Sequence, residues 1–250
     1  MNTTTQRPLT RRPAARSVAA LASLAVVGVA LAGCVPAPLV AAGPRVTTEH
    51  EVSDGVHALR LETAGDVTVE LGDEPGLVVR APSSISERLT VDEEDGTLVL
   101  GSRGPGIWSA RVEYVLTVVS FDELVLEGAG DVTADFSSAD EVDIRVDGAG
   151  DVRATSVDAD EVEVAIGGAG DVRLEGTARS GELTVSGTGS IRASELVLQR
   201  AEAEISGAGD IAVHATDTLD ARISGAGDIR VSGEPRITSE VSGLGDVIEH

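Results

Sequence analysis

The side chains best suited to chemistry in this sequence are aspartates that recur in one short motif. Gly128-Ala129-Gly130-Asp131-Val132 returns in six further copies, one of which has Ser190 in place of the aspartate. The aspartates at this position are Asp131, Asp151, Asp171, Asp210, Asp228 and Asp246. Carboxylate oxygens are preferred ligands of Ca²⁺, and calcium-binding β-helix repeats also combine glycines with an aspartate. The six aspartates are therefore candidate metal ligands.

The same aspartates have a structural alternative, in which each carboxylate accepts hydrogen bonds from nearby backbone N–H groups. Two differences from the calcium repeat favour it: each Asp directly follows the last Gly, and Ser190 removes one ligand from the middle of the series. Like charges about 5 Å apart repel by roughly 1 kcal/mol in water, so the row must face water, backbone donors or cations. We expect no cofactor, with calcium as the alternative.

Arginines follow the Asp or Ser position by two residues in several copies of the motif. They are Arg153, Arg173, Arg192 and Arg230. An outward basic row beside an acidic one could serve a calcium-dependent polysaccharide-acting enzyme, because such sites combine carboxylates with a basic residue. Charge pairing on a solvent-exposed face is the simpler interpretation, since the repeats lack aromatic platforms for sugars and the four histidines are scattered. We therefore expect no catalytic residues and no enzyme activity.

The spacing of the motif predicts the elements that carry these side chains. Its first glycines follow one another at intervals of 20, 20, 19, 20, 18 and 18 residues. Apolar residues alternate with polar ones on both sides of each copy, which is the pattern of β-strands. A unit of this length cannot bury its own apolar side, but stacked coils can. The sequence therefore predicts an all-β parallel solenoid with 18–20 residues per coil.

The paired glycines of the motif are predicted to form its corners. Glycine adopts positive φ without strain and allows a neighbouring coil to approach closely. These structural turn residues are Gly128, Gly130, Gly148, Gly150, Gly168, Gly170, Gly187, Gly189, Gly207, Gly209, Gly225, Gly227, Gly243 and Gly245.

The N-terminal segment has the pattern of a bacterial lipoprotein signal peptide over residues 1–33. An arginine-rich start is followed by the apolar run 18–31, which is too short for a comfortable membrane span. The run ends in Leu31-Ala32-Gly33-Cys34, which resembles a lipobox and predicts lipidation of Cys34. Ordinary cleavage near Ala32, leaving a free thiol, is the alternative. Residues 34–45 then form an Ala- and Pro-rich tether, and residues 46–250 form the solenoid.

Charge limits the partners of the exported part. Beyond residue 33, 15 Arg stand against 42 acidic residues, a net charge of −27. This density disfavours nucleic acid and direct adsorption to anionic lipid head groups. The single cysteine rules out a disulfide framework. We therefore expect an exported protein held on the outer face of the cell membrane by its N-terminal lipid.

The repeats and their Val- and Leu-rich lead-in resemble the head GIN domain family, labelled as heads of autotransporter adhesins. The lead-in comprises residues 65–69, 96–100 and 121–126, and the resemblance covers about residues 50–248. It implies a right-handed parallel β-helix on the cell surface and carries over no catalytic residues. The sequence departs from autotransporters in having a lipobox.

These observations predict a lipid-anchored surface module that binds or adheres to an envelope polymer, a protein or another copy of itself. The last repeat is followed by Val247-Ile248-Glu249-His250, with nothing to cover the final coil. An open solenoid end exposes unpaired backbone groups, so we expect either self-association or an end masked by charge and by the N-terminal segment. The irregular stretch 101–110, which contains Trp108, is a loop that could hold a partner site.

Overall fold

The computed structural model describes residues 43–104 and 111–249. The predicted signal peptide, residues 34–42 of the predicted tether with Cys34, and Trp108 lie outside these residues, whereas Arg45, the last predicted tether residue, already belongs to the first strand. The chain divides after Val40 into two units, and all described residues belong to the second. Within the described ranges, no helix is long and apolar enough to cross a membrane.

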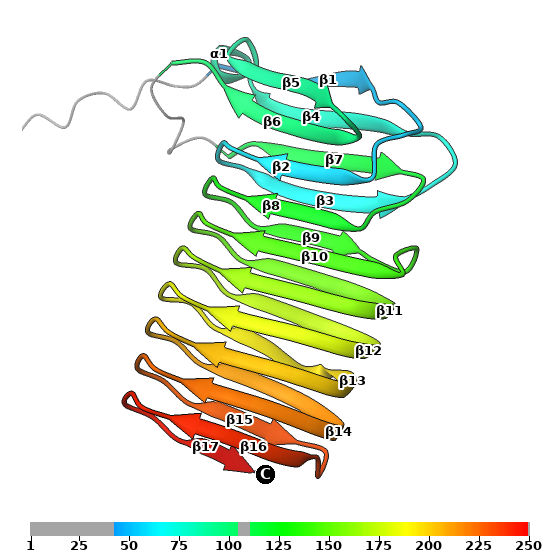
Figure 1. Cartoon of the computed structure of the whole chain (residues 1–250). Coiled ribbons are helices and arrows are strands. Elements are labelled where there is room, and N and C mark those ends of the chain that lie inside the picture. The colour runs from blue at the N-terminus through cyan, green and yellow to red at the C-terminus, as the bar shows by residue number, and fades with distance from the viewer. Residues whose placement is uncertain (1–42, 105–110, 250) are drawn as a thin grey trace, which may run out of the picture. The chain divides into compact units, whose positions relative to one another are not determined.

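The described chain winds into coils that contribute strands to two faces (Figure 1). Face A contains, in spatial order, β5 (Leu89–Glu94), β6 (Thr97–Ser102), β2 (Ala58–Leu61), β8 (Glu123–Leu126), β10 (Glu141–Val146), the second halves of β11 to β14, and β16 (Arg236–Val241). Face B contains β1 (Arg45–Glu51), β4 (Gly76–Pro82), β7 (Glu113–Val118), β3 (Asp66–Leu71), β9 (Val132–Asp135), the first halves of β11 to β14, β15 (Ile229–Ser232) and β17 (Val247–Glu249).

Four long strands run through both faces and make the regular part of the solenoid. They are β11 (Val152–Ile166), β12 (Val172–Val185), β13 (Ile191–Ile205) and β14 (Ile211–Ile223). Equivalent motif residues are parallel partners, so that Val172 pairs with both Val152 and Ile191. Inward side chains of both faces stack as ladders of Val, Leu and Ile in one buried core. The predicted all-β parallel β-helix is therefore confirmed.

The corner opposite the Gly-Ala-Gly-Asp motif is a bend within these strands. At this bend the strands change register, as between Ala154 and Val157 in the pairing of β11 with β12. The other register shifts lie at the same corner. Ser156 also adopts a positive φ of 58° there. The variation in coil length from 18 to 20 residues is therefore absorbed at this bend, and the motif corner keeps its register.

The first coil is stacked out of chain order. Strands β2 and β3 lie between the β6–β7 coil and the β8–β9 coil, pairing with both. The reason is that the partial motif at residues 63–66 continues the corner ladder. Ala64 bridges Ala129, and the Val67 N–H donates to the Asp131 carbonyl. The segment between β6 and β7 lacks the motif, so its coil takes the outer position.

The two ends of the solenoid differ. At the N-terminal end, β1 and β4 on face B and β5 on face A pair antiparallel to their neighbours, and the single helix of the described residues, α1 (Ser83–Ser86), lies beside them. At the other end, β16 and β17 each pair with one described strand, and Leu244 is 78% exposed. Because β1 lies at the opposite end (Figure 1), the described N-terminal segment does not mask the last coil.

Candidate functional site

The motif corner brings backbones of successive coils unusually close together. A Cβ on Gly148 or Gly150 would lie less than 3.0 Å from the carbonyl oxygens of Gly128 and Gly130, and the other paired glycines repeat this approach. Among the paired glycines of the motif, only Gly227 and Gly245 have positive φ, at 149° and 159°. Close approach of the neighbouring coil, more than turn conformation, is therefore the reason for glycine at these positions.

The motif aspartates form a hydrogen-bonded ladder, here called the Asp row, which is interrupted at Ser190. The Asp131 Oδ1 accepts the Asp151 N–H at 3.1 Å, and the Asp151 Oδ1 accepts the Asp171 N–H at 3.0 Å. Asp210 and Asp228 do the same for the next coil at 2.9 and 3.1 Å. This backbone donor, with Arg230 nearby, holds the pKa of the Asp210 carboxyl below its ordinary value. Every carboxylate of the row except that of Asp246 therefore accepts a backbone hydrogen bond from the next described coil.

The arginines two residues beyond the Asp row form a second row beside it on face B, here called the Arg row. Parallel pairing aligns Arg153, Arg173 and Arg192, then Ala212, then Arg230. Their guanidinium groups pair with carboxylates of neighbouring coils. Arg192 reaches back to the Asp171 Oδ2 at 2.8 Å, and Arg230 bridges the Oδ2 atoms of Asp210 and Asp228 at 3.2 and 3.3 Å.

The motif aspartates are thus bonded to backbone donors, Arg192 and Arg230 pair with them, and Arg153 and Arg173 pair with Glu175 and Glu195. Among residues 43–104 and 111–249, no group of three or more His, Cys, Asp or Glu side chains could hold a metal ion. In a calcium site, oxygens of several carboxylates and carbonyls coordinate the same cation. The row instead directs one oxygen of each engaged aspartate at the next backbone N–H.

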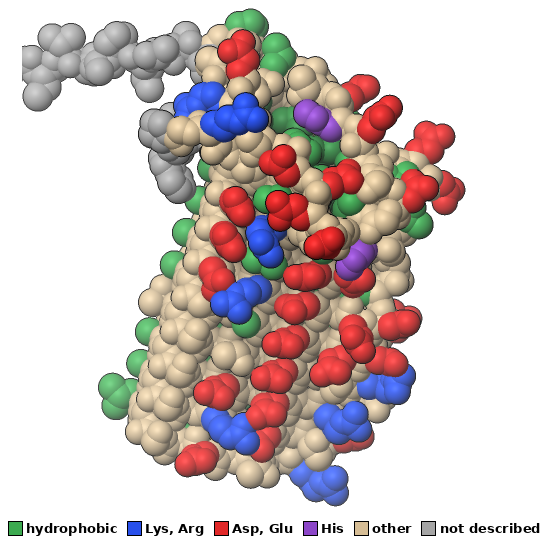
Figure 2. All heavy atoms as spheres, turned by 45° about the horizontal axis from the view of Figure 1, so that its top comes forward, with side chains coloured by type: hydrophobic (Ala, Val, Ile, Leu, Met, Phe, Trp, Pro, Cys, Tyr) green, Lys and Arg blue, Asp and Glu red, His purple; other side chains and the backbone are tan. Residues whose placement is uncertain are grey.

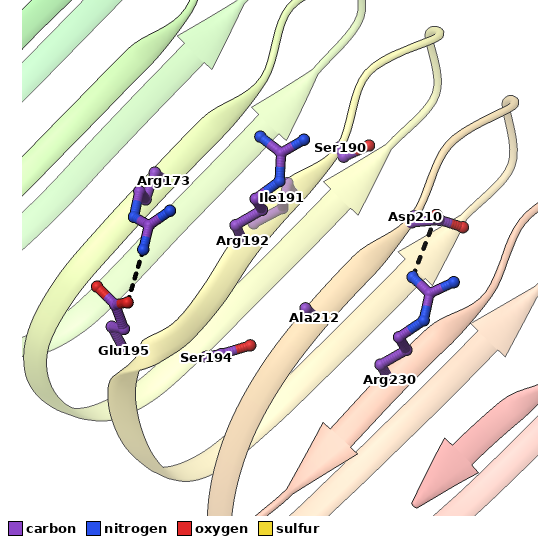
Figure 3. Close-up of a pocket in the computed structure, with 9 residues that line it drawn as sticks. All are labelled: Arg173, Ser190, Ile191, Arg192, Ser194, Glu195, Asp210, Ala212 and Arg230. Carbon is purple, nitrogen blue, oxygen red and sulfur yellow. Dashed lines mark hydrogen bonds and ion pairs between the residues drawn. The ribbon is translucent and has the colours of Figure 1, made fainter. Parts of the chain in front are cut away.

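The two rows are interrupted at adjacent places, and a hollow of about 380 Å³ opens there. Ser190 stands in the Asp row and Ala212 in the Arg row of the following coil. Figure 3 shows the small side chain of Ala212 between Arg192 and Arg230, with Ser190 and Ser194 on either side of Arg192 along the chain. In the coils on either side, an arginine of one coil pairs with an aspartate of the coil before it. Both members of that ion pair are missing here.

One residue that lines the hollow, Asp210, has a backbone N–H without a partner among the described residues. The Ser190 N–H donates to the Asp171 Oδ1 at 2.9 Å, as the ladder requires. The next N–H in the ladder, that of Asp210, faces the short Ser190 side chain and has no acceptor in the part of the chain that the structure describes. Asp210 is partly exposed and lines the hollow, so its N–H is available to an oxygen of a ligand bound there.

Face A carries a different charged feature, here called the acidic column. Its outward side chains pair coil to coil without interruption: Glu123, Asp143, Glu163, Glu182, Glu202 and Asp220. Figure 2 shows acidic side chains running down the molecule as such a column. Arg222 pairs with the last two members, whereas the first four have no ion pair within the described residues. The alternation of face A strands could have revealed this column from the sequence.

The acidic column predicts that stability falls as pH rises toward neutrality. Partial loss of water raises the pKa of Asp143 above its ordinary 3.8, and that of Glu163 above 4.5, the latter also through Asp143, Glu182 and Glu161. Groups with a raised pKa bind protons more readily in the folded chain. The free energy of unfolding should therefore fall as pH rises above these values, and recover on acidification.

Denaturant unfolding between pH 7 and 4.5 measures this effect. Glu163→Gln should raise stability at pH 7 by about 0.2–1 kcal/mol, the size of one cross-strand pair, and should flatten the pH dependence. The control Glu70→Gln removes an exposed carboxylate of β3 outside the column. Asp210 has the opposite effect on stability, because its pKa is lowered in the folded chain. As pH falls below 3.8, protonation of this carboxylate should lower the free energy of unfolding. Equal slopes for both variants would contradict the prediction.

Comparison with known proteins identifies the family. The family model described as "Putative auto-transporter adhesin, head GIN domain" matches residues 56–235. The chain belongs to the head GIN domain family. The match runs from β2 through β15 and leaves out β1, β16 and β17, so it covers most of the described solenoid.

Solved structures agree with this membership. A "putative adhesin" from Bacteroides fragilis is 27% identical, with a TM-score of 0.79, over 83% of this chain and 97% of that one. A "putative adhesin" from Parabacteroides merdae (19%, TM-score 0.64) and a "putative lipid binding protein" from Parabacteroides distasonis (21%, TM-score 0.64) each cover 83% of this chain and are covered over 97% of their own, and share the fold. No curated protein matches the sequence. The head GIN relatives indicate an adhesin-like module, exported or on the cell surface.

Proposed function

We propose that this head GIN protein is a lipid-anchored surface module that adheres without catalysis to a partner in the cell envelope. The observation that carries the proposal is the family match over residues 56–235, together with an adhesin-labelled relative 27% identical along nearly its whole length. The hydrogen-bonded Asp row supports a role without a bound cation. The flat, charged faces supply the surface for binding.

Attachment through Cys34 is the part of the proposal that is tested most directly. Cells that express the full chain are labelled with an alkyne analogue of palmitate and then fractionated. The full chain should carry the label and sediment with membranes. Cys34→Ala should lose the label and leave the membrane fraction. A Cys34→Ala protein that still sediments with membranes would show that another segment anchors the chain.

Adhesion is tested with whole cells, since the full chain is then presented as it is exported. Cells displaying the wild-type protein are compared with cells that express Cys34→Ala, on surfaces coated with envelope polymer, envelope protein or the protein itself. Anchored protein should increase cell retention on one of these surfaces. Equal retention of both strains on all three would reject adhesion, and retention on the self-coated surface would identify homotypic binding.

A further inference from the structure

We propose that the hollow between Arg192 and Arg230 is a binding site for the carboxylate of an acidic sugar. The inference deepens the adhesive function proposed above and rests on it for its biological role. It starts from the double interruption, where Ser190 replaces an aspartate and Ala212 replaces an arginine. The ligand carboxylate would take the place of the side chain that the Asp row lacks.

The neighbouring coils show how this fold binds a carboxylate at that position. One oxygen accepts the backbone N–H of the following coil, as Asp171 does for Ser190 and Asp210 for Asp228. The other oxygen pairs with a guanidinium. At the hollow the corresponding N–H, that of Asp210, is unused. The donor half of the site is therefore already built into the backbone.

Arg192 supplies the cation. Arg230 shows how an arginine of this row bridges two carboxylates. It pairs with Asp228, two residues before it in the same coil, and with Asp210 of the preceding coil. Arg192 already pairs with Asp171 of the preceding coil at 2.8 Å. A carboxylate at position 190 would complete the same bridge around Arg192. Charge-assisted hydrogen bonds of this kind are stronger than neutral ones.

The space beside Ala212 limits the size and polarity of the rest of the ligand. Its volume of about 380 Å³ lies at the lower end of small-ligand sites, which suits one sugar ring. Ser190, Ser194, Glu195 and Asp210 line it with hydroxyl and carboxylate oxygens that can bond sugar hydroxyls. The net charge of −23 for the whole chain opposes a polyanion. A single uronic acid within an otherwise neutral glycan is therefore the ligand class that fits best.

The test is a titration of the exported protein, purified in detergent, followed by the amide NMR signal of Asp210. Methyl glucuronoside is compared with methyl glucoside, which has the same ring without the carboxylate, and with N-acetylglutamate amide as a peptide-type carboxylate. We expect the glucuronoside to shift the Asp210 amide and to bind about ten-fold or more tightly than the glucoside, the difference that one charge-assisted bond makes.

Two variants fill the hollow from within. Ser190→Asp restores the internal carboxylate, and Ala212→Met occupies the space with a long side chain that carries no charge, so each should weaken glucuronoside binding about ten-fold or more. Thr133→Met, in the same outward position of β9, is the matched control and should bind as wild type. Equal binding of the glucoside, stronger binding of the peptide analogue, or unchanged binding by Ser190→Asp would overturn the proposal. If Ser190→Asp cells adhere normally, the adhesive function stands and only this site falls.

Discussion

Replacing Gly189 by alanine should destabilise the solenoid strongly. The new Cβ would lie less than 3.0 Å from the Gly170 carbonyl oxygen and carbon, which are backbone atoms of the coil before. Backbone cannot move aside without breaking the corner ladder, in which the Thr188 N–H donates to the Gly168 carbonyl at 2.8 Å. We expect a loss at the upper end of the about 1–3 kcal/mol seen for overpacking, or more.

Thermal and denaturant unfolding measure this loss. A change of 3 kcal/mol corresponds to a Tm lower by about 6–12 °C for a protein of this size. Gly167→Ser is the matched control, because a Cβ there meets first the Asp147 carboxylate, which can rotate away, and Ser186 is the natural residue one coil later. If Gly189→Ala were as stable as Gly167→Ser, close backbone approach could not explain the repeated glycines.

Removal of one carboxylate from the Asp row should have the second largest effect. Asp151→Ala leaves the Asp171 N–H without its acceptor at 3.0 Å, which should cost about 0.5–1.5 kcal/mol, the net contribution of one hydrogen bond. Asp151→Asn keeps an oxygen in place and should lose clearly less. Hydrogen exchange of the Asp171 amide should accelerate in the alanine variant and stay slow in the asparagine variant.

The control for this prediction lies at the same corner position in the last described coil. Asp246 accepts no backbone bond from a further described coil, although its own N–H donates to Asp228. Asp246→Ala should therefore have little effect on stability. Unfolding with added calcium or with a chelator tests whether the Asp row binds cations instead. If cations held the row together, the chelator would lower the wild-type Tm. Asp151→Asn would then be as unstable as Asp151→Ala.

Much of the fold could be predicted from the sequence because the repeat carries redundant information. Alternation at positions such as Val164, Ile166, Val172 and Leu174 indicates strands, and the constant interval between glycines indicates stacking in register. The same alternation and the same glycine motif recur in every coil, so a pattern that is ambiguous in one copy is clear from the others. The family resemblance follows from the same repeated residues, and the match over residues 56–235 confirms it.

The sequence by itself therefore determined the coil, its core and the repeated corner. Only the tertiary structure decided the stacking of β2 between β6 and β8, because strand order depends on contacts between segments far apart in the chain. It also decided the use of the Asp row, since each carboxylate bonds a donor about 20 residues away. The hollow could be recognised only from the sequence and the structure together. In the sequence, Ser190 and Ala212 are two separate departures from the repeat. They line one hollow because parallel pairing places their coils side by side.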